Sequence, residues 1–456
     1  MNQLLRIRLV RGLGRLALLA LSLSPAACTF DVPDFNNQSL QGLQQNPTPS
    51  GVATAAQGLL IDARDMAAEH AQDLGIIGRE ALNLSVSNGT LPTYIIGPIN
   101  TGVFFVIFTW RGAYQGIRDA NLLLHAADAV SGFTQAEREA TRGFAKTMQA
   151  YSFLHVIVER DTFGIPVDVD IPATDVAPVL DKTAVYARID QLLDQAQVHL
   201  QNGGPSFPFR LTSGFAGFNT PSTFLMVNRA IKARTDVYSN NWSGALAALG
   251  ASFLDTTAPL ELGAYHIFTN NSGDETNPLF NLSYFWAHPS ILSEAQQRAD
   301  GTPDLRAQQK VYVGATGTLI GETSNLRFSN PSGPADRLAL IRNEELILLR
   351  AEANLGLGNR SAAISDINVI RVRSGGLPTI ADPFAGDLLE ELLYQKRYSL
   401  WWEWGHRWAD ARHYGKLTEL PRDQPDHKIF EVLPYESGEC FARQQAAKGC
   451  TGVSGI

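Results

Sequence analysis

The feature that most restricts the fold of this chain is an apolar periodicity typical of α-helices, found in pairs of segments joined by short breaks. In one pair, Leu346, Leu349 and Ala353 are spaced by three or four residues, which places them on one face of a helix. Gly358 ends this helix and Ser361 is suited to begin the next one. The two segments are therefore predicted to form an antiparallel helical hairpin.

The same pattern predicts a chain made mostly of helices. The expected helices are 51–73, 104–129, 135–159, 182–200, 222–239, 243–250, 342–357, 361–373 and 386–412. Ala351 and Ala363 lie twelve residues apart on the two helices of one hairpin, and Ala233 and Ala245 repeat that spacing in another. Small residues at this separation let two helices approach closely, as in tetratricopeptide repeats. We expect a mainly all-α fold of such hairpins.

Two long stretches, 75–103 and 251–335, lack the helical pattern and are rich in glycine, asparagine, proline and aromatic residues. Long irregular insertions on a rigid scaffold are usually functional. Within the second stretch, residues 278–284 alternate between apolar and polar side chains, which predicts a short β-strand. The expected β content is therefore minor.

The beginning of the chain reads as an export signal. Four arginines and no acidic residue precede an apolar run at 16–23, which is too short to span a bilayer. The run is followed by Pro25, two alanines and Cys28, similar to a bacterial lipobox, so Cys28 is expected to be lipidated. Because Pro25 departs from the usual aliphatic residue, cleavage by the ordinary secretory peptidase is the alternative. Residues 28–50 are then an anchor and a tether rich in Asn, Gln, Pro and Ser.

Only two other cysteines remain, Cys440 and Cys450. An exported chain permits a disulfide between them. A loop this short would contribute roughly 2–3 kcal/mol in the chain-entropy model. The alternative is two free thiols on a loose tail.

Composition and motifs exclude several classes of function. The net charge is −8 and no Lys/Arg-rich block is present, so a nucleic-acid partner is not expected. The chain has no Gly-x-Ser-x-Gly elbow, no phosphate-binding loop and no His-Glu-x-x-His motif. We therefore expect no enzymatic activity and no cofactor.

Potential metal ligands have a structural interpretation that we favour. His406, Asp410 and His413 are spaced as i, i+4 and i+7, so one helical face could present two imidazoles and a carboxylate, an arrangement suited to zinc. The same helix carries a tryptophan stripe that begins at Trp401, so burial would make these polar groups packing contacts. Asn270–Glu275 has calcium-type oxygens but lacks the spacing of a calcium loop. We expect no metal site.

Several motifs, taken in order, resemble one known family. Residues 343–354 (NEELILLRAEAN), 371–375 (RVRSG), 392–403 (LLYQKRYSLWWE) and 405–410 (GHRWAD) are similar to the C-terminal hallmarks of SusD/RagB nutrient-binding outer-membrane lipoproteins. Phe163-Gly-Ile-Pro matches a turn in the earlier half of that family. Each motif is short, but the ordered set extends over most of the chain after Cys28.

The resemblance implies both a fold and a role. It divides the chain into a signal peptide (1–27), an anchor and tether (28–50), and two parts (51–255 and 256–456) of one compact unit. Members capture oligosaccharides or peptides at the cell surface and deliver them to a SusC-like TonB-dependent transporter. A lipid-anchored position at the outer membrane, facing the cell surface, follows. The alternative is a scaffold lipoprotein that uses its hairpins to dock other proteins.

Four aromatic residues are the expected ligand contacts. Tyr284, Phe285 and Trp286 follow the expected strand, and Tyr94 lies in the earlier irregular stretch. Sugar rings stack on aromatic faces while their hydroxyl groups take hydrogen bonds from neighbouring polar residues. The alternative is that these rings fill cores beneath the loops. Trp286 is the preferred platform because no other tryptophan lies in the same irregular stretch.

Overall fold

The computed structural model describes residues 40–456 except 88, 89, 173 and 282. The expected signal peptide, Cys28 and residues 29–39 of the tether lie outside these residues. Within the expected tether, residues Leu40–Gln45 form the short helix α2, where an irregular segment was expected. Leu43 is buried against the core, so apolar packing fixes this turn of helix.

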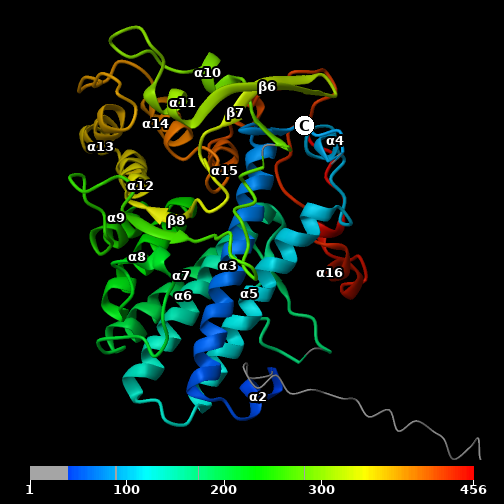
Figure 1. The fold of residues 1–456 in the computed structure, drawn as a ribbon, viewed down its shortest axis with the longest axis vertical. Coiled ribbons are helices and arrows are strands. Elements are labelled where there is room, and N and C mark those ends of the chain that lie inside the picture. Colours follow the sequence, from blue (N-terminus) through cyan, green and yellow to red (C-terminus); the bar gives the residue numbers. More distant parts are fainter. Residues whose placement is uncertain (1–39, 88–89, 173, 282) are drawn as a thin grey trace, which may run out of the picture.

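The predicted mainly α-helical fold is confirmed. The longer helices are α3 (Pro49–Ile77), α5 (Phe104–Ala129), α6 (Gln135–Arg160), α7 (Lys182–Gln201), α8 (Pro221–Tyr238), α9 (Trp242–Gly250), α12 (Asn343–Gly356), α13 (Arg360–Arg373), α14 (Leu388–Ser399) and α15 (His406–His413). Shorter ones are α4 (Leu91–Ile95), α10 (Ser290–Ser293), α11 (Leu305–Lys310) and α16 (Ser437–Ala442). Figure 1 shows the long helices α3, α5 and α6 running side by side.

Successive helices pack against one another in one continuous series, from α3 through α5, α6, α7, α8 and α9 to α12 and α13. Local sequence explains several helix starts. Thr134 and Glu137 form a capping box at α6, and Asn241 caps α9 by accepting a hydrogen bond from the Gly244 amide. The paired alanines of both predicted hairpins are fully buried, as close helix packing requires.

The β-strands form four antiparallel pairs among the described residues. The pairs are β1 (Ala81–Asn83) with β5 (Phe285–Ala287), β2 (Ile165–Pro166) with β3 (Val179–Leu180), β4 (Gly263–His266) with β8 (Leu338–Arg342), and β6 (Val311–Leu319) with β7 (Glu322–Phe328). The predicted strand at 278–284 is wrong. The described residues of that segment form turns and irregular backbone, and pairing with β1 begins at Phe285 instead.

The predicted helix 386–412 is also wrong, because it consists of two helices, α14 and α15, separated by a tight turn. Trp402 and Gly405 both have positive φ angles, 61° and 71°, which an α-helix cannot contain. A Cβ atom on Gly405 would lie 2.3 Å from the Cβ of Leu74 on α3. Close contact with α3 therefore requires glycine at this turn.

The main hydrophobic core contains buried residues from both the earlier and the later half of the chain. A smaller apolar cluster joins α12, α13 and α14 and includes Ala351, Ala363 and Ile367. The C-terminal segment returns to the first half, where Val453 pairs with Ile99 just after α4; Figure 1 marks the C-terminus beside that helix. Among the described residues, the helices lack the combination of length and apolar character needed to cross a membrane.

Candidate ligand cleft and the polar network behind it

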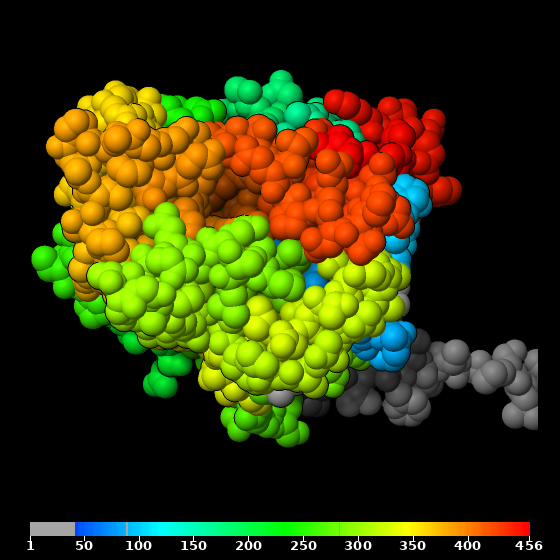
Figure 2. Space-filling view, turned by 90° about the horizontal axis from the view of Figure 1, so that it is seen from above, coloured from blue at the N-terminus to red at the C-terminus, as the bar shows by residue number. Residues whose placement is uncertain are grey.

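A cleft of about 430 Å³ lies between α14, α15, the short 3₁₀ helix η3 (Leu417–Glu419) and the segment 294–296. Figure 2 shows this hollow between the orange C-terminal helices and the yellow-green segment that follows β5. Its polar lining is contributed by both sides of the cleft: Glu294, Gln296, Asp387, Glu390, Arg397 and Lys416.

Tyr394 is the aromatic side chain that lines this cleft. Its hydroxyl group donates to Oδ2 of Asp304 (3.0 Å) and accepts from the backbone amide of Gln296 (2.8 Å). Its ring packs against Tyr398 with centroids 4.4 Å apart. These contacts fix a half-buried ring at the wall of the cleft, where an amphipathic ligand can contact it.

Charged side chains surround Tyr394 and are oriented by one another. Lys416 forms ion pairs with Glu390 and Glu419, while Arg397 pairs with Glu294 across the cleft. Carboxylate, ammonium and guanidinium groups together supply both acceptors and donors of hydrogen bonds. The arrangement suits a ligand with many hydroxyl groups, which can donate and accept at each position.

A buried polar network supports the floor of the cleft. The Lys396 ammonium group donates to Glu352 (2.7 Å) and to Asp410 (2.5 Å), and both side chains are buried with it. Burial raises the pKa of Asp410 to about 7, although the charge of Lys396 opposes the shift. Asp410 also lines the cleft, so the network reaches its surface. His406 lies 3.1 Å from the Tyr238 hydroxyl group; it and Asp410 both have partners on other helices.

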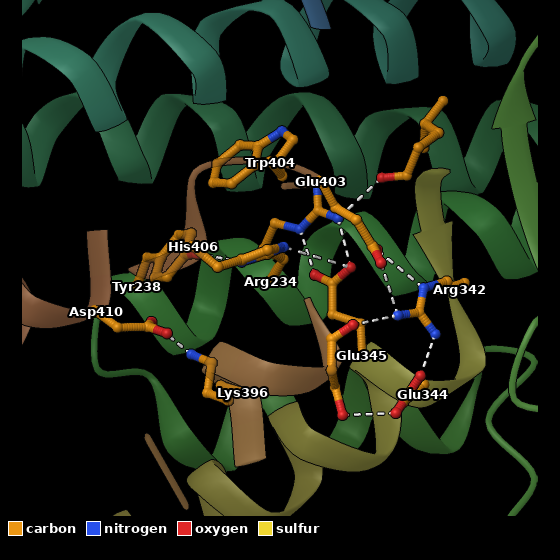
Figure 3. A network of polar contacts seen from close by, with 12 residues as sticks. Arg234, Tyr238, Arg342, Glu344, Glu345, Lys396, Glu403, Trp404, His406 and Asp410 are labelled. Atoms are coloured by element: carbon orange, nitrogen blue, oxygen red, sulfur yellow. Dashed lines mark hydrogen bonds and ion pairs between the residues drawn. The ribbon is translucent and has the colours of Figure 1, made fainter. Parts of the chain in front are cut away.

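The network continues through two arginines (Figure 3). Arg234 of α8 binds Glu345 of α12 through two bonds of 2.6 and 2.7 Å, and Arg342 of β8 binds Glu403 through two bonds of 2.9 Å. Arg342 also pairs with Glu344. Burial would raise the pKa of Glu344, but the Arg342 charge outweighs it and lowers that pKa to about 2. The acidic pair of the 343–354 motif thus joins the C-terminal turn to the scaffold.

Glu403 and Arg407 lie four residues apart, a spacing that would pair them on a continuous helix, but the turn before α15 prevents this. Glu403 precedes α15 and binds Arg342, whereas Arg407 donates to the backbone carbonyl of Arg79 (2.7 Å). The turn at Gly405 separates the two side chains and directs each of them to a different partner. Trp401, Trp404 and Trp408 are buried although they do not share one continuous helix.

Three of the four predicted ligand contacts are buried, so the prediction that they offer exposed platforms is wrong. Trp286 and Phe285 belong to β5 and are 7% and 4% exposed. Tyr94 is 3% exposed, donates to Asp73 (2.5 Å) and stacks on Phe105. Phe285 packs against Trp402, and Trp286 packs against the β6 backbone. Tyr284 is half-buried in the preceding turn, and none of the four lines the cleft.

The residues that do line the cleft were missed. Tyr394 lies within the 392–403 motif, but its spacing there resembles that of a packing residue. Gln296 and Glu294 carry no local signal, because only the tertiary structure brings them to α14.

The predicted disulfide is confirmed. Cys440 and Cys450 are bonded, with Cα atoms 5.4 Å apart.

Potential metal ligands also meet beside the cleft. His288, Glu322 and Asp423 each offer a ligand atom, and these atoms lie within 4.8 Å of one another. They line a second pocket of about 330 Å³, which shares Glu294 with the cleft.

Comparison with known proteins places the fold. No protein-family model matches the chain. A SusD-like protein P38 from Formosa agariphila is 29% identical over 157 residues, a match that spans 30% of this chain and 30% of that relative. A SusD-like carbohydrate binding protein from Bacteroides vulgatus superimposes with a TM-score of 0.61 and 19% identity, covering 80% of this chain and 83% of its own. A laminarin binding SusD-like protein gives a TM-score of 0.57 and 17% identity, covering 88% and 99%. The SusD-like fold that the motifs predicted is therefore confirmed for this chain.

Proposed function

We propose that this protein binds oligosaccharides in the cleft between α14, α15 and the segment 294–296. The observation that carries the proposal is the position of Tyr394, a fixed aromatic ring surrounded by carboxylate, amide and guanidinium groups in an open cleft. A sugar ring presents apolar C–H faces to an aromatic ring and hydroxyl groups to such polar neighbours. Tyr394 takes the role that the sequence suggested for Trp286.

Similar proteins support a sugar as the ligand class. Two solved structures of the same fold are named for carbohydrate binding and for laminarin binding. We infer binding without covalent chemistry, so the protein is not an enzyme. Peptides are the second ligand class, since the mixed charges of the cleft also suit a peptide backbone.

The complete role that we propose is nutrient capture at the cell surface. Lipidation of Cys28 would anchor the protein in the outer membrane, and the ligand would be delivered to a SusC-like TonB-dependent transporter. The series of helical hairpins offers a long docking surface for such a partner. The competing role, a scaffold lipoprotein, would use the same surface without any ligand in the cleft.

The test is a glycan and peptide binding screen followed by calorimetry. We expect binding of at least one polysaccharide, with laminarin as the first probe. Tyr394→Ala should lower the affinity by roughly two- to tenfold, since an aromatic contact contributes roughly 0.5–1.5 kcal/mol and 1.4 kcal/mol is tenfold. Tyr312→Ala is the matched control, because Tyr312 is an exposed tyrosine on β6, outside the cleft.

Three results would contradict the proposal. No binding across both libraries would favour the scaffold role, and binding of peptides alone would replace the ligand class. Binding that survives Tyr394→Ala and Glu390→Ala in a variant with an unchanged melting temperature would move the site away from this cleft.

A separate experiment tests anchoring and delivery. It compares crosslinking to the transporter in intact cells between the parent and Cys28→Ser.

A further inference from the structure

The second pocket brings together three potential metal ligands from distant parts of the chain. His288 follows β5, Glu322 begins β7, and Asp423 lies just after η3. Nε2 of His288 lies 2.9 Å from Oδ2 of Asp423. A tetrahedral zinc ion with bonds of about 2.0 Å separates its ligands by roughly 3.3 Å. The distance between the His288 and Asp423 atoms is near this value, and the ligand atom of Glu322 lies within 4.8 Å of both.

Another buried histidine, His427, contacts the Glu322 carboxylate. His427 is 1% exposed, and its Nδ1 atom lies 3.1 Å from Oε1 of Glu322. Neither of these two atoms makes a hydrogen bond with another described group, although both are buried. Buried polar atoms without partners are rare and costly in a folded protein. A cation held by His288, Glu322 and Asp423 would give the Glu322 carboxylate a partner, and His427 would contact that carboxylate from outside the ligand set.

The two carboxyl groups lie close together, and His288 pairs with one of them, Asp423. Arg79 is the nearby buried cation, but its guanidinium donates four hydrogen bonds to backbone carbonyl groups. Among the described residues, Arg79 forms no ion pair with Glu322 or Asp423. Glu322 is 2% exposed, and two adjacent buried carboxylates are strongly unfavourable unless a cation or a shared proton lies between them.

The pocket gives an ion a route to these ligands. It has a volume of about 330 Å³ and is lined by His288, Glu322 and Asp423 together with Ser290 and Glu294. The Asp423 side chain is 43% exposed, so the ligands can be reached from solvent without unfolding.

We propose that His288, Glu322 and Asp423 bind a divalent metal ion, with water from the pocket completing the coordination. An imidazole nitrogen combined with carboxylate oxygens matches zinc better than calcium or magnesium, which prefer oxygen alone. Without metal, Nδ1 of His288 accepts from the Ser290 amide and its Nε2–H group donates to Asp423. When the metal binds Nε2, the ring proton moves to Nδ1. The Nδ1–H group then donates a hydrogen bond to the Ser290 hydroxyl oxygen at 2.9 Å, in place of the bond from the Ser290 amide.

The bound ion would act as a clamp. It would join the turn after β5, the tip of the β6–β7 hairpin and the segment after η3. Glu294 lines both this pocket and the ligand cleft, so the clamp would stabilise one wall of the cleft. The site is independent of which ligand the cleft binds.

The experiment measures zinc binding to the full protein after treatment with a chelator and dialysis. We expect one equivalent of ZnCl₂ to bind in calorimetry, the melting temperature to rise with zinc, and bound Co²⁺ to show the visible absorption of a tetrahedral site. Glu322→Gln and Asp423→Asn, which keep the side-chain shape, should each weaken zinc binding by about tenfold or more. Elemental analysis of the purified protein gives the metal that it retains.

The matched control is His125→Ala. His125 and Asp170 form a His–carboxylate pair at 2.8 Å on the surface, with side chains 62% and 58% exposed, so this variant should bind zinc like the parent. The proposal is overturned if the parent binds neither zinc nor cobalt, which would mean that the carboxylates share a proton instead. It is equally overturned if both carboxylate variants bind zinc with the affinity of the parent.

Discussion

At the scale of single residues, Trp286 is held by contacts on several sides of its ring. Its indole N–H group donates to the carbonyl oxygen of Ala315 (2.8 Å), and the Arg327 guanidinium lies 3.6 Å from a ring centroid. A Cβ atom on Gly317 would be 2.6 Å from the ring, so the β6 backbone passes directly against it. The residue joins β5 to the β6–β7 hairpin.

Trp286→Ala should therefore reduce stability rather than ligand affinity. Removal of a buried tryptophan leaves a cavity, and we expect the free energy of unfolding to fall by about 3–5 kcal/mol. Chemical denaturation measures it, with Tyr312→Ala as an exposed aromatic control that should change stability by less than about 0.5 kcal/mol. A variant with the stability of the parent and weaker glycan binding would restore Trp286 as a ligand platform.

His266 provides a pH-dependent contribution with a defined sign. Burial, with the nearby charges of Arg64 and Arg234, lowers the pKa of this histidine to about 3. Between that value and about 6.5 the unfolded chain binds a proton that the folded chain does not. The contribution of His266 is therefore full above about pH 6.5 and declines as the pH falls towards 3.

His266→Gln, which retains a polar group near the Tyr151 hydroxyl at 3.1 Å, removes this dependence. We expect the parent to lose about 1.4 kcal/mol per pH unit more than the variant between pH 6 and 4. Denaturation curves of both proteins across this range check the difference, and parallel pH profiles would show that His266 is protonated in the folded protein.

At the scale of elements, the α12–α13 hairpin depends on small residues at its contact. Ala351 and Ala363 are fully buried in the cluster that joins these helices. Ala351→Trp or Ala363→Trp should destabilise the protein by at least about 1–3 kcal/mol, because a closely packed contact cannot accept the added volume. Ala362→Trp is the control, since Ala362 is exposed on the same helix. Equal melting temperatures for all three variants would show that the two helices do not pack closely there.

Local patterns predicted the helices well and the turns and strands poorly. The bounds of α5 agree with the expected range, because residues within and next to this helix determine both its apolar periodicity and its ends. The break between α14 and α15 could not be predicted, since it depends on Leu74, far away in sequence, beneath Gly405. The β6–β7 hairpin was not predicted because β6 is largely exposed, so its sequence lacks a clear alternation of apolar and polar residues.

The candidate site was harder to predict than the fold. Aromatic residues in an irregular stretch predicted a ligand platform. Trp286 instead lies on a strand that pairs with β1, and its ring is covered by the β6 backbone. Tyr394 lies on a helix with a packing pattern, and it becomes a cleft residue only because the segment containing Gln296 passes beside it. Such convergence is a property of the tertiary structure and leaves no local signal.

At the scale of the whole molecule, the C-terminal segment closes the structure against its first half. Tyr435 packs on Trp110 of α5 with ring centroids 4.9 Å apart, and its backbone amide donates to Gly449. The disulfide between Cys440 and Cys450 closes a short loop within this segment. It therefore restrains the part of the chain that returns to α4 and α5.

The double variant Cys440→Ala/Cys450→Ala should lose about 2–3 kcal/mol of stability, the loop-closure entropy expected for a ten-residue separation. Thermal or chemical denaturation measures the loss. A reducing agent should produce the same loss in the parent and none in the variant. If reduction leaves the parent unchanged, the loop is held by its packing alone.

The contact between α3 and the turn before α15 also determines the order of folding. Gly75 lies against the ring of Trp402, the Trp402 amide donates to Glu80 (3.3 Å), and Arg79 donates to the carbonyl oxygen of Lys428. Contacts between residues more than 300 positions apart form late, because a long loop must close first. A growing chain therefore cannot bury this face of its first long helix until nearly all of the protein has been synthesised. Until then this end of α3 exposes apolar surface, which favours chaperone binding.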